Sequence, residues 1–404
     1  MNAFDILKER GFLQQCTDET ALRAAMDEGP VTFYVGFDPT GDSLHVGHLL
    51  PVMAMSWMQR AGHIPIAIVG GGTAMVGDPS GKSEMRKMLT VDDIAHNTAC
   101  LKSQLEHFLV LDGTKGHMVN NADWLMGLSY IEFLRDIGRH FSVNRMLAAE
   151  AYKQRLEKGL SFIEFNYQLL QAYDFLELFR RYDCTLQMGG DDQWGNILAG
   201  TDLVRRLEAT KTHGLTQPLI MTASGAKMGK TAQGAVWLDP AKLSPFDYYQ
   251  YWLNVDDRDV GRFLRLYTAV DIEEIKQLES LKGADIRDAK RRLAWESCKL
   301  VHGLEQADKA ASGAKAMVSA AGSDDMPTCS VTFDADRIKV YAIMQSAGLT
   351  KSNGEGRRLI KGGGVRFNGQ KLTDGEATLS ASELAGGDAV LRIGKKRAVR
   401  LLLA

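Results

Sequence analysis

The sequence predicts an α/β protein: a parallel-sheet domain, then an α-helical domain, then a small α+β domain. Residues 31–37 and 64–69 are short apolar runs typical of buried strands, and a segment of helical pattern separates them. At 404 residues the chain is too long for one ordinary core. Its 45% hydrophobic and 24% charged residues are typical of a globular protein.

The first half alternates strands and helices. Residues 44–61 have helical character and stop before Gly62, a typical helix-ending residue. Strand, helix and strand in this order predict a parallel βαβ unit with a right-handed crossover. We expect further strands around Leu186 and over residues 219–221, with a mostly helical insertion over roughly residues 92–181. Ligands of such sheets bind beyond the carboxyl ends of the strands.

The second half changes character twice. Residues 245–319 are helical by pattern, and residues 320–328 have linker composition. The remaining chain predicts short helices near residues 340–347 and 356–361, then a strand over 364–368. We therefore predict three domains, with the bounds 1–240, 241–325 and 336–404.

The charge of the chain is distributed unevenly. The net charge is −2, but residues 337–404 hold 13 Lys and Arg against 5 Asp and Glu, which leaves them at +8. A compact basic region on an acidic body indicates a nucleic-acid contact. On charge alone, a solvated surface without a partner is an equal alternative.

Cysteine use and the N-terminus both indicate a cytoplasmic protein. The five cysteines are scattered and form no Cys-x-x-Cys pair, which argues against a disulfide framework or a structural zinc site. Residues 1–12 predict an amphipathic helix and lack the features of a signal peptide. No apolar run approaches the roughly 18–20 residues that span a bilayer, so we expect no membrane segment.

Two segments imitate a phosphate-binding P-loop. Residues 77–83 and 225–231 both end in Gly-Lys-Ser or Gly-Lys-Thr. A P-loop has four residues between its glycines and these segments have three, so the sequence argues against a P-loop NTPase. Their lysines can still attract phosphate by charge.

His45 and His48 lie at the start of the predicted helix after the first strand. Their spacing puts both rings on one helix face, with Gly47 between them allowing close approach to the backbone. A metal site is a weak interpretation without a third nearby ligand. Phosphate binding at the helix N-terminus is stronger, and a purely structural role is its equal alternative.

Two further segments are unusually polar for the elements that carry them. Tyr167, Gln171 and Asp174 form one stripe on an otherwise apolar helix, which predicts either a solvent-facing stripe or the wall of a ligand pocket. Asp191 and Asp192 follow glycines at a strand end. They are either helix-start residues or ligands for an amine or a ribose.

Taken together, these segments resemble class I aminoacyl-tRNA synthetases, specifically the bacterial-type tyrosyl-tRNA synthetases, over nearly the whole chain. Residues 34–48 resemble the family's HIGH region and residues 227–231 its KMSKS loop. Residues 77–81, 167–174 and 190–196 resemble segments specific to the tyrosine enzyme. The resemblance implies a Rossmann-like catalytic domain and an S4-like RNA-binding domain at the C-terminus.

The resemblance also implies the reaction. Tyrosine attacks the α-phosphate of ATP to give tyrosyl-adenylate, and the tyrosyl group then passes to the 3' end of tRNA(Tyr). Magnesium would accompany ATP, and no protein-bound metal or organic cofactor is expected. Stabilising charge on the leaving phosphates is the main catalytic task. The residues expected to do this are Thr40, His45, Lys82, Arg86, Lys227 and Lys230.

The family pattern assigns the remaining site residues by substrate. Those expected to bind tyrosine are Tyr34, Asp78, Tyr167, Gln171, Asp174 and Gln193. Those expected to contact ATP or the adenylate are Gly36, Asp38, Gly47, His48, Gly189, Asp192 and Lys230. Those expected to contact tRNA are Arg357, Arg358, Lys361 and Arg366.

The resemblance leaves two alternatives and one expected assembly. A tryptophanyl-type enzyme shares the fold and the chemistry, but the pair Tyr34 and Asp174 and the S4-like tail argue against it. A non-catalytic RNA-binding paralogue is opposed by the intact histidines and lysines of the two signature segments. Members of the family are homodimers, so we expect a homodimer.

Overall fold

The computed structural model describes most of the chain. The described residues are 2–80, 89–148, 152, 156–157, 159–223, 225, 228–231, 234–319, 327–333, 336–384, 389–394 and 397–403. They divide into two compact units: the first joins Met1–Asp239 with Gly261–Ile275, and the second joins Pro240–Val260 with Lys276–Ala404. The three-domain division stays a prediction.

A mixed sheet forms the centre of the first unit. In the described part of the chain its order is β1-β6-β5-β2-β3-β4, with β1 antiparallel to β6 and the other neighbours parallel. The predicted α/β fold class with a parallel sheet is confirmed. The strands are β1 (Gln15–Cys16), β2 (Thr32–Phe37), β3 (Ile64–Val69), β4 (His117–Asn120), β5 (Cys184–Gly190) and β6 (His213–Gln217).

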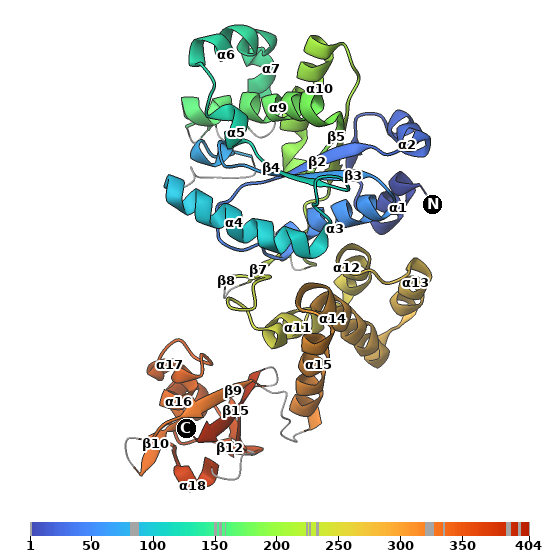
Figure 1. Cartoon of the computed structure of the whole chain (residues 1–404). Coiled ribbons are helices and arrows are strands. Elements are labelled where there is room, and N and C mark those ends of the chain that lie inside the picture. Colours follow the sequence, from blue (N-terminus) through green and yellow to red (C-terminus); the bar gives the residue numbers. More distant parts are fainter. Residues whose placement is uncertain are drawn as a thin grey trace. The chain divides into compact units, whose positions relative to one another are not determined.

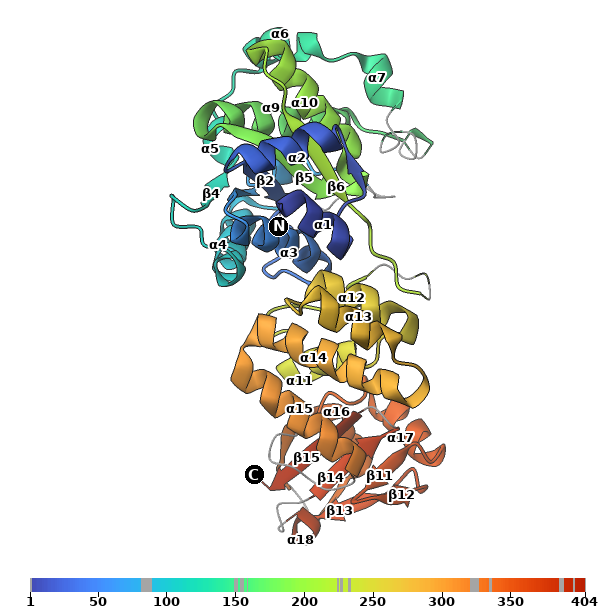
Figure 2. The ribbon, with the colours of Figure 1, turned by 90° about the vertical axis from the view of Figure 1, so that its right-hand side faces the viewer.

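Helices cover both faces of this sheet. Figure 1 shows α1 (Ala3–Arg10), α3 (Val46–Arg60) and α4 (Val91–Phe108) on one face. On the other face lie α9 (Phe162–Tyr182) and α10 (Trp194–Glu208), and Figure 2 shows the same layers from the side. Other described helices of this unit include α2 (Glu19–Glu28), α5 (Ala122–Leu125), α6 (Tyr130–Asp136), α7 (Val143–Ala148) and α12 (Val260–Tyr267).

The apolar residues of α9 explain its place against the sheet. Phe175, Leu176 and Leu178 are buried together with Ile66 and Ile68 of β3 in one cluster. The helix begins at a capping box, in which the Ser161 side chain accepts from the Glu164 backbone, and it ends at Asp183 in the left-handed conformation. The two caps fix where α9 begins and ends. Its buried apolar face fixes the direction in which its polar stripe points.

Some predicted elements agree with the structure and others are wrong. The predicted strands 31–37 and 64–69 are β2 and β3, and the predicted helix 44–61 is α3. The strand expected over residues 219–221 is wrong, because the buried strand is β6, whose His213 and Gln217 give it no apolar run. In the described part of residues 92–181, helices and the loops between them are interrupted by β4, a short and half-buried strand that its sequence does not indicate.

The topology creates a crevice at the carboxyl ends of β2 and β5. From β2 the chain crosses through α3 to β3 on one side, and from β5 it crosses through α10 to β6 on the other side. The connections therefore diverge where β2 and β5 lie side by side, which is where open α/β sheets bind ligands.

The second unit contains helices and a small sheet. Its helices are α11 (Pro245–Leu253), α14 (Ile286–His302) and α15 (Leu304–Ser319), while α13 (Ile272–Ser280) begins in the first unit. The strands β9 (Thr328–Val331), β11 (Val365–Phe367), β12 (Gln370–Leu372), β14 (Ala389–Ile393) and β15 (Arg397–Leu403) form a sheet of order β12-β11-β14-β15-β9.

The C-terminal sheet has a core of its own. Its buried residues include Val340 and Ile343 of α16 (Val340–Ser346) and Ile360 of α17 (Asn353–Lys361). The strands β10 (Arg337–Lys339) and β13 (Thr378–Ser380) pair separately, and α18 (Ala381–Leu384) follows β13. Among the described residues, no helix combines the length and apolar character needed to cross a membrane.

Candidate active site

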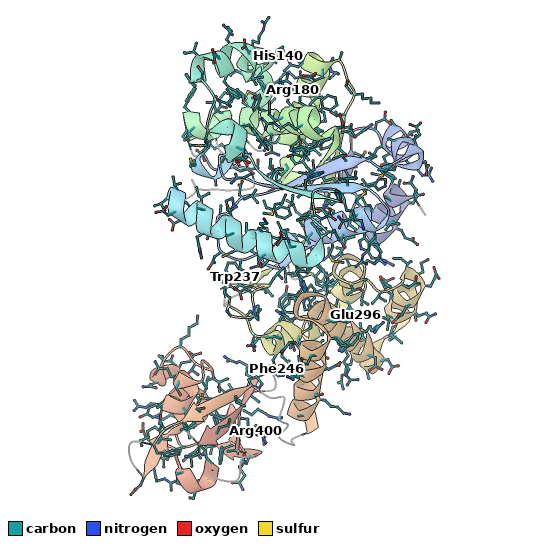
Figure 3. The ribbon with its side chains drawn as sticks, in the orientation of Figure 1. His140, Arg180, Trp237, Phe246, Glu296 and Arg400 are labelled. Carbon is teal, nitrogen blue, oxygen red and sulfur yellow. The ribbon has the colours of Figure 1, made fainter. Side chains whose placement is uncertain are left out.

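A cavity of about 830 Å³ opens at the carboxyl ends of β2 and β5. Its wall comes from β2, the segment after it, the loop after β3, the end of β4, the polar stripe of α9 and the turn after β5. Trp237, labelled in Figure 3, follows the hairpin strands β7 (Lys230–Thr231) and β8 (Gly234–Ala235) and also lines it. Most of the predicted site residues therefore line one cavity.

The deep end of the cavity, lined by Tyr34, Asn121 and Asp174, centres on a buried carboxylate that Trp124 also contacts. Asp174 accepts hydrogen bonds from the Asn121 amide at 3.0 Å and from the Trp124 indole N–H at 2.8 Å. Burial raises the pKa of Asp174 from 3.8 to about 7, although these two donors pull it down. The negative charges of Asp38 and Glu177 act with burial.

Tyr34 supplies a hydroxyl at the same end. The residue is 2% exposed, and its oxygen is buried without a hydrogen-bond partner in the part of the chain that the structure describes. Burial, with the charge of Asp174 second, raises the pKa of Tyr34 well above 10.0. Buried hydroxyls are almost always hydrogen-bonded in native proteins. A polar ligand atom in the cavity would supply the missing partner.

Asp78 lies in a network of amides on another wall of the cavity. It accepts from the Gln193 amide at 2.7 Å and from the backbone N–H of Ser80 at 2.9 Å. The Asn196 amide nitrogen lies 3.1 Å from the side-chain oxygens of both Gln171 and Gln193. The network fixes Asp78 and the two glutamines relative to one another, and Asp78 is 6% exposed.

Residues 38–48 and 234–238 form the mouth of the cavity. The His45 and His48 rings stack with centroids 3.9 Å apart. Nδ1 of His45 accepts from Gly47 N–H at 3.0 Å, and Nδ1 of His48 accepts from His45 N–H at 3.2 Å. Each ring, when neutral, therefore carries its proton on Nε2, where it can donate to a ligand.

Backbone pairing joins the two parts of the mouth. Val46 N–H donates to the carbonyl of Val236 at 2.9 Å, and Leu238 N–H donates to the carbonyl of Leu44 at 2.9 Å. A Cβ atom at Gly229, whose φ is +81°, would lie 2.9 Å from the backbone nitrogen of Gly47. Gly229 and residues 236–238 thus pack directly on the histidine motif.

The structure brings many of the predicted site residues to the cavity. Gly47 is set back from the wall and holds His45. Lys82, Arg86 and Lys227 lie outside the described residues, and only the backbone of Lys230 is described, as part of β7. The predicted residues that line the cavity are Tyr34, Gly36, Asp38, Thr40, His45, His48, Asp78, Tyr167, Gln171, Asp174, Gly189, Asp192 and Gln193.

Several residues of the site carry no clear signal in the sequence and were not predicted. Asn121 and Trp124 hold Asp174, and they follow β4, a strand that its sequence does not indicate. Recognising that strand would have put Asn121 at the carboxyl edge of the sheet. Asn196 lies in the segment 190–196, from which Asp192 and Gln193 were predicted instead. Thr73 and Ser80 belong to no sequence pattern that indicates a site. Among the described residues, no group of three or more His, Cys, Asp or Glu could hold a metal ion.

The predicted tRNA contacts lie in the second unit. Arg357, Arg358 and Lys361 are exposed on α17, and Arg366 is exposed on β11. The Arg357 guanidinium stacks on Tyr341, 4.3 Å from the ring centroid, and donates to its hydroxyl at 2.8 Å. All four predicted residues are therefore exposed on the second unit.

Comparison with known proteins decides the family. A model of class I tRNA synthetases for tryptophan and tyrosine matches residues 26–319. A model of the SYY-like C-terminal domain of tyrosine–tRNA ligases matches residues 319–400. A tyrosine–tRNA ligase of Clostridium botulinum (strain 657 / Type Ba4) is 50% identical over 405 residues, which cover 100% of both chains. The chain belongs to the class I tyrosine–tRNA ligases.

Other relatives agree with this membership. A tyrosine–tRNA ligase of Clostridium perfringens (strain 13 / Type A) is 48% identical over 404 residues, again 100% of both chains. A C-terminally truncated mitochondrial tyrosyl-tRNA synthetase of Aspergillus nidulans superposes with a TM-score of 0.69 at 31% identity, covering 77% of this chain and 92% of its own. The resemblance stated from the motifs is confirmed, and a tyrosine–tRNA ligase is favoured over the tryptophanyl-type alternative.

Proposed function

We propose that this tyrosine–tRNA ligase activates L-tyrosine with ATP to tyrosyl-adenylate and pyrophosphate, and then transfers tyrosine to the 3' end of tRNA(Tyr). One observation carries the substrate assignment. The deep end of the cavity pairs an unpartnered buried hydroxyl on Tyr34 with a buried carboxylate on Asp174, among the residues that the structure describes. A phenol is a ligand whose hydroxyl can donate to the Asp174 carboxylate and accept from the Tyr34 hydroxyl.

Recognition of the phenol follows from the cost of leaving buried groups unpaired. Phenylalanine in the same position would leave the Tyr34 hydroxyl and the Asp174 carboxylate without the phenol oxygen. Enzymes of this family are the standard example of discrimination by that effect. Asn121 and Trp124 each donate to a different oxygen of Asp174, which fixes the orientation of the carboxylate.

The amide network supports a second contact, with the ammonium group of tyrosine. Asp78 supplies a carboxylate that a cation can pair with, and Gln193 holds it at 2.7 Å. Tyr167 and Gln171 line the same cavity from α9. We assign these four residues to the amino group because carboxylate, amide and hydroxyl oxygens all accept from an ammonium.

The residues at the mouth of the cavity are suited to binding ATP. Gly36, Gly189, Asp38 and Asp192 lie at the ends of β2 and β5, where the nucleotide part of the adenylate would meet backbone and carboxylates. Gly47 and His48 lie in the first turn of α3, whose N-terminus favours an anion. Magnesium would arrive bound to the ATP phosphates, because it retains water and needs only one or two protein carboxylates.

Catalysis in this proposal is stabilisation of charge. As the α-phosphate is attacked, negative charge grows on the leaving pyrophosphate, and fixed donors lower that barrier. Thr40 and His45 line the cavity as neutral donors. We assign the matching cations to Lys82, Arg86, Lys227 and Lys230 on the strength of the family motifs alone.

The second unit would bind tRNA, and the first would form a dimer. We assign the tRNA contact to the exposed basic residues of α17 and β11, since phosphate contacts dominate such affinity. Side chains of α6, α7 and α9 share one cluster, and other apolar residues of these three helices are exposed to 56–70%. Exposed apolar patches of this kind mark interfaces, which supports a homodimer. The exposed residues are Ile131, Val143 and Phe162.

We propose a cytoplasmic location, where ATP and tRNA are found.

Amino-acid-dependent exchange of pyrophosphate into ATP tests the proposal. The full chain with magnesium should catalyse exchange with L-tyrosine, and phenylalanine and tryptophan should give exchange lower by roughly 10³-fold or more, since each lost charged hydrogen bond costs about 1.5–3 kcal/mol. Equal exchange with tryptophan would contradict the substrate assignment. Absence of exchange with any amino acid would contradict the proposed activity.

A further inference from the structure

We propose that Asn97 and Gln104 of α4 are positioning residues for adenylate formation, acting by holding the backbone that carries Thr40 and His45. This inference rests on the proposed function, because it takes those two residues to contact the reacting phosphates. It concerns a helix that the family motifs do not include.

The two amides share one face of α4 with an apolar residue of the cavity wall. Asn97, Leu101 and Gln104 have the spacing i, i+4 and i+7, which aligns them on one stripe. Leu101 is buried and lines the cavity. Asn97 is 9% exposed, and Gln104 is half-buried. This face of α4 therefore packs under the segment after β2.

Each amide bonds to one end of the segment 39–44. The Asn97 amide nitrogen donates to the carbonyl of Pro39 at 2.9 Å, immediately before Thr40. The Gln104 amide oxygen accepts from the backbone N–H of Leu44 at 2.9 Å, immediately before His45, and from the Ser43 hydroxyl at 3.4 Å. The two bonds thus flank the stretch that begins with Thr40 and leads into His45.

Apart from the backbone bond between Leu238 and Leu44, the segment has little regular structure to hold it. Residues 38–44 lie between β2 and α3, with bends at residues 40–43 and no helix or strand. Donors that stabilise a transition state must be fixed beforehand, and a displacement of about 1 Å can cost roughly 100-fold in rate. The side chains of Asn97 and Gln104 are outside the set that lines the cavity. They therefore act through Thr40 and His45.

The two side chains have opposite roles in their hydrogen bonds, so the same substitution should affect them differently. Asn97 acts as a donor, so Asn97→Asp removes the N–H and sets a carboxylate against the Pro39 carbonyl. Gln104 acts as an acceptor, so Gln104→Glu keeps an oxygen for Leu44 N–H, whereas Gln104→Met removes it. The same amide-to-acid change on one helix face should damage one site and spare the other.

Single-turnover formation of tyrosyl-adenylate by the full chain measures the effect. We expect Asn97→Asp to lower the rate about 10- to 100-fold, with the affinities for tyrosine and ATP changed less than about threefold. Gln104→Met should lower the rate about 10-fold, and Gln104→Glu should restore most of it. Asn254→Asp, an exposed amide-to-acid change on the end of α11, is the control.

The outcomes separate this inference from the proposed function. A wild-type chain without tyrosine-dependent exchange overturns the proposed function. An active wild type with equal losses in Asn97→Asp and Gln104→Glu overturns the inference alone, and so does a loss that appears only in tyrosine affinity. If Asn97→Asp lowers thermal stability so far that it does not fold, the pair Gln104→Met and Gln104→Glu still decides: no difference between them overturns the inference.

Discussion

The deep end and the mouth of one cavity are held together in different ways. At the deep end, side chains bond to side chains, as Asn121 and Trp124 do to Asp174. At the mouth, the bonds hold backbone: Val46 bonds to Val236, and the side-chain amides of α4 bond to the segment 39–44. The first arrangement belongs to residues of a helix and a strand end in the core, and the second belongs to loops.

This difference suggests that the deep end and the mouth have different roles in the reaction. Side chains on helices and strands keep their geometry best, whereas loops open with a smaller free-energy cost. The choice of amino acid then depends on the rigid deep end. The rate of adenylate formation depends on the mouth, where Thr40 and His45 must reach a position that α4 and the segment 234–238 define.

The largest effect is expected from breaking the deep end. Asp174→Ala removes the acceptor of the phenol and leaves the Asn121 and Trp124 donors unpaired in a buried site. We expect tyrosine-dependent pyrophosphate exchange to fall by about 10³-fold or more, because each lost charged hydrogen bond costs about 1.5–3 kcal/mol. Steady-state exchange at saturating ATP measures it.

A matched control shows that the loss belongs to the site. Asp288→Ala removes an exposed carboxylate whose ion pair with Arg291 lies on the surface of α14, and exchange should not change. Circular dichroism and thermal unfolding should show Asp174→Ala folded. Near-normal exchange in that variant would contradict the tyrosine pocket.

The same comparison explains what the sequence could predict. The strands β2 and β3 are apolar, and the stripe of Tyr167, Gln171 and Asp174 stands out on an apolar helix. β4 and β6 were not found, because their polar residues are buried or half-buried for reasons of topology. Asn121 therefore stayed hidden although it bonds to Asp174. The bonds from α4 to the mouth were equally hidden, since contacts across about 60 residues leave no local pattern.

The second largest effect is a pH dependence of stability that originates at the deep end. The pKa of Asp174 is raised by burial from 3.8 to about 7. The folded chain therefore binds this proton more tightly than the unfolded chain. Its contribution to stability is complete below pH 4 and disappears as the pH rises through about 7. Without ligand, the wild type should lose about 2–3 kcal/mol relative to Asp174→Asn between pH 5 and pH 8.

Urea unfolding of both proteins at matched pH values measures this difference. Asp174→Asn cannot titrate, so subtraction removes the other ionisable groups that the two proteins share. Saturating tyrosine should reduce the slope, because a phenol donor stabilises the ionised carboxylate. Parallel pH profiles for the two proteins without ligand would show that Asp174 is already ionised at pH 5.

The smallest effect is expected at the mouth, from Gly47→Ala. A Cβ atom there would lie 2.7 Å from Cε1 of His45, so the ring must leave its stack on His48. The ring also loses its bond from Gly47 N–H. We expect the rate of tyrosyl-adenylate formation to fall about 10-fold, an effect of about 1.4 kcal/mol, with tyrosine affinity unchanged.

Gly354→Ala provides the matched control for that change. Gly354 is the second residue of α17, as Gly47 is the second residue of α3, and the nearest atom to its added Cβ is the Ser352 hydroxyl at 3.9 Å. Alanine favours a helix over glycine by about 1 kcal/mol, so both variants gain helix stability and only Gly47→Ala should lose rate. A loss of tyrosine affinity in Gly47→Ala would mean that the mouth also shapes the deep end, and the division between the two would fail.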